Sequence, residues 1–363
     1  MADFVMMMKG TEAVAEAAIR AGCRFFAGYP ITPQNEVPEY MGRKQPKVGG
    51  VFIQGESEVA SISMVYGAAS AGVRAMASSS SCGISLKSEG IAFLAGSRLP
   101  AVIANFQRGG PGIGSIQPSQ QDYTQATKAS GNGGFRMIVY APSTIQEAVD
   151  FTYAAFDTAD KYLNPVMVLL DGFTGTMMEP VELPPAKSDE EVKAIRDAKT
   201  WKTTGRNGEK ISHEVMCGAN RDRRYNLMHL NIRDTAMYEK WQEDEVDWEE
   251  VQTEDAELII TAYGISGRIA KSAVDLLRQD GYKVGLIRPK KIHPFPVQAY
   301  EKLDFGKLKG ILSVEMSIPA QFAVDVINVV KDRTPVDTVL TSGGIILDRD
   351  DIIDKAKQMY GER

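Results

Sequence analysis

The first 185 residues alternate short apolar runs with longer segments rich in small residues, and this alternation constrains the fold more than any other feature. The apolar runs have the length of β-strands, and they lie at 25–27, 50–54, 74–78, 101–106, 136–140 and 165–170. Helical segments separate most of them, and a helix between two strands is the usual connection in a parallel sheet. The pattern therefore predicts an α/β domain with a doubly wound parallel sheet covered by helices on both faces.

The segment from Thr11 to Ala21 shows the helical pattern most clearly. Its apolar residues share one face, Thr11 is a suitable N-cap, and Gly22 is a suitable C-cap. Further helices are expected at 56–72, 84–94 and 146–159. Ligands of such sheets bind beyond the carboxyl ends of the strands, so the site is expected among the turns at 28–33, 54–58, 78–83, 107–114 and 171–175.

Residues 187–255 differ sharply in composition from the rest of the chain. They contain 12 basic and 17 acidic residues, which supply −5 of the net charge of −6, together with all three tryptophans. A solvated linker explains the charges but not Trp201, Trp241 and Trp248, which need an apolar surface to pack on. We therefore expect a charged, irregular arm or linker that lies over a domain or over a partner chain.

Residues 256–363 return to the alternation of strands and helices. Strands are expected at 257–262, 283–289 and 310–314, and helices at 267–279 and 319–330. These elements predict a second, smaller α/β domain. The expected organisation is a first domain at 1–186, the arm at 187–255 and a second domain at 256–363.

Charge and hydropathy argue against several classes of partner. A net charge of −6 disfavours nucleic acid, because phosphate binding needs clustered positive charge. The longest apolar runs, such as 101–104 and 166–170, are far shorter than the roughly 20 residues that cross a bilayer. The first five residues, MADFV, include no basic residue, so we expect no signal peptide.

Cysteine and histidine are too sparse for an obvious metal or cluster site. The three cysteines stand 59 and 135 residues apart without a CxxC pair, and the three histidines have no metal-ligand spacing. An odd and sparse cysteine count suits a reducing cytoplasm better than a disulfide scaffold. Chemistry must then come from carboxylates, arginines, hydroxyls or a bound cofactor.

Phosphate-binding and nucleophile motifs are also missing. The chain has no GxxxxGK[ST] segment, which argues against a P-loop. The glycines at 109–114 (GGPGIG) do not have GxGxxG spacing and are typical of an ordinary turn. No Ser-His-Asp or Cys-His pair can be placed from the sequence.

Glu58 is the most informative carboxylate. The helix expected behind it is almost wholly apolar or small, so Glu58 is expected to be buried on most sides. A helix start stabilises negative charge through its free N–H groups and its dipole. The same position also fits a purely structural role, in which Glu56 and Glu58 are ordinary acidic residues of a first helical turn.

Two further residues lie at the expected ligand edge. Arg108 follows a buried strand, where its guanidinium suits a carboxylate or phosphate, although an ordinary ion pair explains it equally well. Thr32 stands between Pro30 and Pro33, which stiffen the backbone around its hydroxyl. Thr32 could equally cap a short helix that begins at Pro33.

Four spaced motifs, taken together, resemble one known family. They are GYPITP at 28–33, Ser57-Glu58 followed by YGA at 66–68, SSSSCGISL at 78–86, and QRGGPG at 107–112. In this order they resemble the α-type subunit of the 2-oxoacid:ferredoxin oxidoreductases. Within that family the segments 8–13 (MKGTEA), 46–50 (PKVGG) and 160–165 (DKYLNP) are most similar to the branched-chain, 2-oxoisovalerate type.

The resemblance implies specific roles for the candidate residues. The first domain would be the pyrimidine-binding half of a thiamin diphosphate site, and the second would be like the C-terminal domain of transketolase. Glu58 would contact the aminopyrimidine ring, Thr32 would hydrogen-bond substrate or cofactor, and Arg108 would pair with the substrate carboxylate. The other cofactor-binding residues would be Pro30, Ser80 and Gly83.

The implied reaction is oxidative decarboxylation of a 2-oxoacid with coenzyme A, which gives acyl-CoA, CO2 and reduced ferredoxin. This chain lacks the GDG…NN segment that holds Mg²⁺ and the diphosphate, and it lacks cysteines for iron–sulfur clusters. The resemblance therefore implies a β subunit for the diphosphate half and a ferredoxin-like δ subunit that carries [4Fe-4S] clusters. A γ subunit, an external ferredoxin and assembly as a dimer of heteromers in the cytoplasm are further expectations.

Two alternatives stay open at this point. A 2-oxoglutarate-specific member of the family would need a second cation or donor cluster in its pocket, whereas a branched-chain substrate needs apolar walls. From a different class, the chain could be a non-catalytic scaffold or a nucleotide-binding protein. The presence of Thr32, Glu58 and Arg108 together favours catalysis, since a scaffold does not need them.

Overall fold

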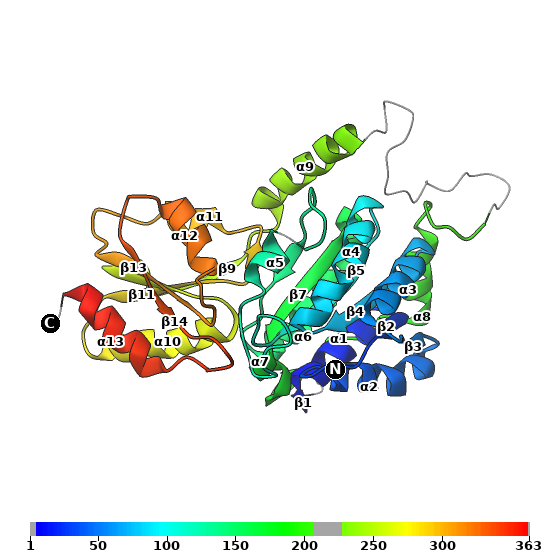
Figure 1. Cartoon of the computed structure of the whole chain (residues 1–363), viewed down its shortest axis with the longest axis horizontal. Coiled ribbons are helices and arrows are strands. Elements are labelled where there is room, and N and C mark those ends of the chain that lie inside the picture. Colours follow the sequence, from blue (N-terminus) through cyan, green and yellow to red (C-terminus); the bar gives the residue numbers. More distant parts are fainter. Residues whose placement is uncertain (1–4, 129, 206–226, 362–363) are drawn as a thin grey trace.

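A computed structural model describes residues 5–128, 130–205 and 227–361 of the chain. His213 and Cys217 lie outside these residues. The elements gather around two large sheets, which lie side by side along the long axis of the molecule (Figure 1). None of the described helices is both long enough and apolar enough to span a bilayer.

Seven strands form the first sheet. Their order is β12 (Lys291–His293), β6 (Ile138–Tyr140), β7 (Pro165–Asp171), β5 (Ala101–Gln107), β4 (Ala75–Ser79), β2 (Phe25–Gly28) and β3 (Val51–Gln54). All neighbouring pairs are parallel except β12 with β6, which is antiparallel. The doubly wound parallel sheet expected from the sequence is therefore confirmed.

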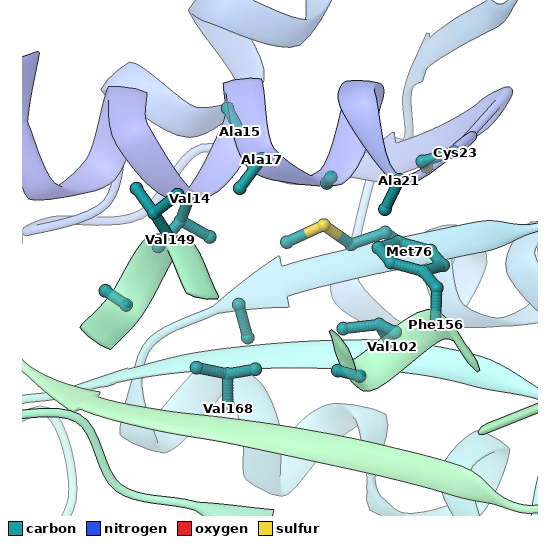
Figure 2. Close-up of a cluster of buried hydrophobic side chains, with 14 of the residues drawn as sticks. Val14, Ala15, Ala17, Ala21, Cys23, Met76, Val102, Val149, Phe156 and Val168 are labelled. Carbon is teal, nitrogen blue, oxygen red and sulfur yellow. The ribbon is translucent and has the colours of Figure 1, made fainter. Parts of the chain in front are cut away.

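Helices cover both faces of this sheet because the strands are apolar on both sides. Helices α1 (Gly10–Arg20), α2 (Glu36–Lys44) and α6 (Ile145–Tyr162) pack on one face, and α3 (Glu58–Ser70) and α4 (Ser81–Gly96) pack on the other. Figure 2 shows Val14 and Ala17 of α1 above Met76, Val102 and Val168 of the strands. The neighbouring residues 77, 103 and 167 belong to the opposite core, as the period of two requires.

Several helix ends differ from the sequence-based expectation. Thr11 is not an N-cap, because β1 (Val5–Lys9) pairs with β8 (Met178–Glu182) as far as Lys9 and the chain enters α1 directly. Thr32 does not cap a helix at Pro33, since Pro33 lies in a turn and α2 begins only at Glu36. Helix α3 begins at Glu58, two residues later than expected, so Glu56 lies outside it and Ser57 is the N-cap.

The second sheet has five strands. Their order is β14 (Val336–Leu340), β13 (Gly310–Glu315), β10 (Leu258–Thr261), β11 (Val284–Pro289) and β9 (Trp248–Val251), and only β9 is antiparallel to its neighbour. Helices α10 (Gly264–Gln279) and α13 (Arg349–Tyr360) cover one face, and α12 (Phe322–Val330) covers the other. Three short helices lie between successive strands: α5 (Tyr123–Thr127) between β5 and β6, α7 (Gly172–Thr176) between β7 and β8, and α11 (Val297–Glu301) between β12 and β13.

The segment at 187–255 is more regular than expected. Its described part contains α8 (Asp189–Asp197), α9 (Leu227–Asp244) and β9. Trp241 of α9 is fully buried, and its ring lies 5.6 Å from that of Tyr162 on α6. The charges of the segment, such as Glu245 with Lys161, pair across this contact, so apolar packing and ion pairs together hold the arm on the first sheet.

Candidate active site

The candidate residues lie at one edge of the first sheet. Strands β2, β3, β4, β5 and β7 run parallel and end together, at residues 28, 54, 79, 107 and 171. The turns named from the sequence follow these strand ends directly. The turns therefore lie at one edge of the sheet, and that this edge binds the ligand stays a prediction.

Glu58 is the first residue of α3, and it is only 5% exposed. The hydroxyl of Ser57 accepts a hydrogen bond from the Ala60 amide at 3.2 Å, so the N-cap function is already fulfilled without Glu58. Within the described residues, no hydrogen bond or ion pair reaches the Glu58 carboxylate. Because Ser57 already caps α3, the Glu58 carboxylate stays available for a ligand, unlike an acidic residue that serves as the cap.

The backbone of α4 approaches Glu58 at Gly83. A Cβ atom at Gly83 would lie 2.7 Å from Oε1 of Glu58 and 2.1 Å from the hydroxyl of Ser79, so a side chain there would displace these groups. The hydroxyls of Ser79 and Ser80 are buried and have no hydrogen-bond partner. The side chains of Glu58, Ser79 and Ser80, which have no hydrogen-bond partner, thus lie around the start of α4.

Arg108 is buried, and its guanidinium is largely occupied by groups of its own chain. It donates hydrogen bonds to the carbonyls of Thr32 at 3.0 Å and Ile113 at 2.9 Å, and to the sulfur of Cys82 at 3.1 Å. Its Nε atom is buried and has no partner. Arg108 therefore ties the 28–33 turn, the glycine-rich turn and the start of α4 together, and it keeps donors for a ligand.

Thr32 and Pro30 are both exposed at this edge. The Thr32 carbonyl is held by Arg108, and its side chain lines a cavity of about 320 Å³. Ile116 and Phe173 give this cavity apolar walls, and Asn35, Glu36 and Gln117 give it polar ones. The threonine thus lines a recess of mixed polar and apolar character.

The first turn of α4 joins the two groups of candidate residues. Cys82 contacts Arg108, and the next residue, Gly83, contacts Glu58. Ser81 completes the connection, because its hydroxyl accepts the Arg108 amide at 3.0 Å and donates to Asp122 at 2.7 Å. Burial raises the pKa of Asp122. The structure contains no direct contact from Thr32 or Pro30 to Glu58 within its described part.

Lys87 is a residue that sequence reasoning missed. It lies on α4, is fully buried, and donates to the Glu58 carbonyl at 3.3 Å and to the Ser61 hydroxyl. Burial lowers its pKa to about 8, and the charge of Glu58 opposes that shift. The helical spacing of Ile84, Lys87 and Ile91 places the lysine on the buried face, and this spacing was the available signal.

Cys23 and Cys82, the cysteines of the described part, form no disulfide. Cys23 is buried, and burial raises the pKa of its thiol to about 12. No cluster of three or more histidine, cysteine, aspartate or glutamate side chains with a metal-binding arrangement occurs in the described ranges.

Two family models match this chain over most of its length. Residues 16–247 match the thiamine diphosphate-binding region of pyruvate flavodoxin/ferredoxin oxidoreductases, and residues 256–352 match core domain II of pyruvate:ferredoxin oxidoreductase. The solved structure of a 2-oxoglutarate:ferredoxin oxidoreductase from Magnetococcus marinus shares the fold, with a TM-score of 0.84 and 24% identity. The match covers 98% of this chain and 65% of that one. A split-gene transketolase is more distantly similar in fold, with a TM-score of 0.57.

Curated relatives cover the chain almost completely. The ketoisovalerate oxidoreductase subunit VorB of Methanothermobacter marburgensis is 44% identical over 98% of both chains. The 2-oxoglutarate synthase subunit KorA of Methanocaldococcus jannaschii is 35% identical over 94% of this chain and 96% of its own. These matches confirm the resemblance seen in the four sequence motifs. The chain therefore belongs to the family of 2-oxoacid:ferredoxin oxidoreductase subunits, with a thiamin diphosphate-type first domain and a transketolase-like second domain.

Proposed function

We propose that this chain is the pyrimidine-side subunit of a thiamin diphosphate-dependent, CoA-acylating oxidoreductase that decarboxylates a branched-chain 2-oxoacid and reduces ferredoxin. The observation that carries the proposal is the buried Glu58 carboxylate, which has no partner within the described residues. The VorB relatives, which are 42% and 44% identical over 98% of the chain, support the branched-chain substrate.

The residues around Glu58 suit the aminopyrimidine of the cofactor. The ring offers nitrogen donors and acceptors, and the hydroxyls of Ser79 and Ser80 are buried polar groups that need such partners. The α4 backbone at Gly83 leaves this surface free of side chains. Glu58, Ser80 and Gly83 would therefore hold the pyrimidine, with Pro30 and Thr32 nearby at the same edge.

Glu58 would exchange a proton with the ring nitrogen that it faces. When bound, thiamin diphosphate supplies a nucleophilic carbon that attacks the 2-oxo group. The contribution of Glu58 is to hold a proton at its carboxyl oxygen and so to favour the reactive form of the ring. Burial strengthens this hydrogen bond, because water does not compete for it.

Arg108 and Thr32 would orient the substrate. The guanidinium is anchored by the carbonyls of Thr32 and Ile113, so its remaining donors have a fixed direction. A fixed arginine at the mouth of the site suits the carboxylate of a 2-oxoacid. Because the carboxylate leaves as CO2, Arg108 would act mainly in substrate binding.

The walls near Arg108 favour an apolar substrate side chain. Ile113 and Ile116 are 84% and 57% exposed on the glycine-rich turn, and Ile116 lines the recess beside Thr32 with Phe173. A branched aliphatic chain buries these surfaces, whereas a second carboxylate needs a cation or donor cluster.

Partner chains would complete the site. Three large apolar side chains of α3 and α4 stay exposed: Val59, which follows Glu58, Leu86, which precedes Lys87, and Phe93 further along α4. Such a surface is typical of a buried interface in an assembly. We assign it to a β subunit that supplies Mg²⁺ and the diphosphate site, with cluster-bearing δ and γ chains passing electrons to ferredoxin in a dimer of heteromers. The lone chain should accordingly fail to bind thiamin diphosphate tightly, and micromolar binding would contradict this assignment.

The direct test is turnover by the complete complex. The co-expressed subunits are assayed with thiamin diphosphate, Mg²⁺, coenzyme A and a viologen acceptor, using 2-oxoisovalerate, pyruvate and 2-oxoglutarate in turn. We expect kcat/KM to be highest for 2-oxoisovalerate. Absence of viologen reduction with every 2-oxoacid would contradict the function and favour a scaffold.

A 2-oxoglutarate-specific enzyme is the second candidate. It is favoured by the KorA relatives, of which the one from Methanocaldococcus jannaschii is 35% identical over 94% of the chain. In the same assay, a kcat/KM that is highest for 2-oxoglutarate would select this candidate over the first.

A further inference from the structure

Lys87 is unusual because it is a fully buried lysine without an ion-pair partner. Among the described residues, no carboxylate oxygen lies within ion-pair distance of its ammonium, and the charge of Glu58 only partly opposes the lowering of its pKa by burial. Burying an ammonium without a close counter-ion costs free energy, so a chain that needed only packing would place an apolar residue there.

The contacts of Lys87 converge on the residue proposed for cofactor binding. Its ammonium donates to the main-chain carbonyl of Glu58 at 3.3 Å and to the hydroxyl of Ser61. The Ser61 hydroxyl in turn donates to the same Glu58 carbonyl at 2.9 Å. These three groups form a closed triangle over the first turn of α3.

One face of α4 is shaped for this arrangement. Gly83, Lys87 and Gly90 stand at helical spacing, and a Cβ at Gly90 would lie 2.5 Å from the Ile62 side chain. The two glycines let α3 and α4 approach closely, and the lysine occupies the space between them. The Glu58 side chain thus runs along α4, with its carboxylate at Gly83 and its carbonyl at Lys87.

We propose that Lys87 is a positioning residue for Glu58, whose ammonium fixes the first turn of α3 by binding the Glu58 carbonyl and the Ser61 hydroxyl. The inference rests on the proposed role of Glu58 in thiamin diphosphate binding. A neutral, apolar side chain at position 87 would make neither hydrogen bond and would leave the first turn of α3 less constrained.

The positioning role predicts a specific pH dependence. Since burial lowers the pKa of Lys87 to about 8, its ammonium is present below pH 8 and is lost as the pH rises above that value. Glu58 on α3 is the one titratable group acting on it among the described residues. Cofactor affinity should therefore fall on the alkaline side of pH 8.

The test uses the assembled complex and calorimetric titration with thiamin diphosphate and Mg²⁺, together with kcat and KM for the cofactor between pH 6.5 and 9.5. For Lys87→Met we expect the cofactor Kd to rise about tenfold at pH 7, a size usual for groups that orient a ligand-binding side chain. In the Lys87→Met complex the cofactor affinity should no longer fall as the pH rises above 8. Lys87→Arg, which stays charged, should regain most of the affinity and also lack the alkaline loss.

Lys199→Met is the matched control. Lys199 is also a buried lysine with a lowered pKa, but its ammonium pairs with Asp160 at 2.6 Å, away from the ligand edge. This variant should lose thermal stability without a change in cofactor Kd. The inference would be overturned if the Lys87→Met complex lost only stability. In that case its cofactor Kd would stay within twofold of the parent value, and its affinity would still fall above pH 8. An inactive parent complex would instead contradict the proposed function.

Discussion

The two sheets each place a buried glutamate next to the start of a helix, and the two glutamates have opposite environments. Glu315 ends β13 and accepts hydrogen bonds from the amides of Gln321, Phe322 and Ala323, each at 3.0 Å. Glu58 begins α3, and no hydrogen bond or ion pair reaches its carboxylate from the described residues. Both side chains are buried, so burial alone does not separate the two roles.

The difference between them lies in hydrogen-bond satisfaction. Glu315 meets the free N–H groups where α12 begins and so stabilises the fold, even though burial raises its pKa. Glu58 leaves that task to Ser57 and keeps its own oxygens free. In this fold a satisfied buried carboxylate is structural, and an unsatisfied one is available for a ligand.

The largest expected effect is on turnover at Glu58. Glu58→Gln keeps the shape of the side chain but removes its exchangeable proton, so turnover of the assembled complex should fall about 1,000-fold. Assembly and thermal unfolding midpoint should stay unchanged, because no hydrogen bond in the described structure depends on this carboxylate. Turnover near that of the parent would return Glu58 to the role of an ordinary acidic residue at a helix start.

The converse effect is expected at Glu315. Glu315→Ala would leave three amides without an acceptor, which costs about 3 kcal/mol. The thermal unfolding midpoint of the complex should fall by about 5 °C, whereas kcat per assembled complex should remain that of the parent. A loss of kcat at unchanged stability would contradict the distinction drawn between the two glutamates.

His293 extends the comparison to a half-buried group that links the two parts of the chain. It lies on β12, its Nδ1 is 2.7 Å from the Met137 carbonyl, and burial lowers its pKa to about 4. The unfolded chain, with the ordinary histidine pKa, binds the proton more readily, so stability should be lost as the pH falls below about 6.5.

Between pH 7 and pH 5 this linkage amounts to about 2 kcal/mol. His293→Asn keeps a donor for the Met137 carbonyl and cannot be protonated. The parent complex should therefore lose more of its thermal midpoint than the variant over this pH range. Equal losses would show that His293 is not the group responsible.

The smallest effect is expected at Arg108. Part of its guanidinium is held by carbonyls of the chain, as Glu315 is held by amides, and part is without a partner, as Glu58 is. For Arg108→Ala we expect the KM for the 2-oxoacid to rise about tenfold with a smaller change in kcat. Arg288 is the control, since it is also buried but pairs with Glu147 at 2.6 Å and Glu249 at 2.7 Å. Arg288→Ala should lower stability and leave KM alone. An Arg108 variant with unchanged KM would make Arg108 structural as well.

Most of the first sheet was predictable because the spacing of apolar residues along the sequence differs between its strands and its helices. The β2, β4, β5 and β7 strands and helices α1, α3, α4 and α6 all follow local apolar patterns. Helix α2 was missed because Pro38 and several charges interrupt its pattern. Strand β12 was missed because its pairing with β6 is decided by a contact across some 150 residues, which no local pattern records.

The site was predictable to the level of single residues but not of their contacts. The apolar sequence behind Glu58 indicated its burial, and the structure confirms it. That Arg108 would be held by the carbonyls of Thr32 and Ile113 could not be foreseen, because turns bring these atoms together. Lys87 lay on a predictable face, yet a lysine is usually assigned to the surface.

Titration of the assembled complexes with thiamin diphosphate tests the central claim most directly. Three complexes are compared by calorimetry at pH 7: the parent, Glu58→Gln and Glu315→Gln. We predict that the parent and Glu315→Gln bind the cofactor with the same Kd, and that Glu58→Gln binds it at least about tenfold more weakly. Equal affinity of the Glu58→Gln complex, with normal turnover, would contradict the assignment of Glu58 to the cofactor.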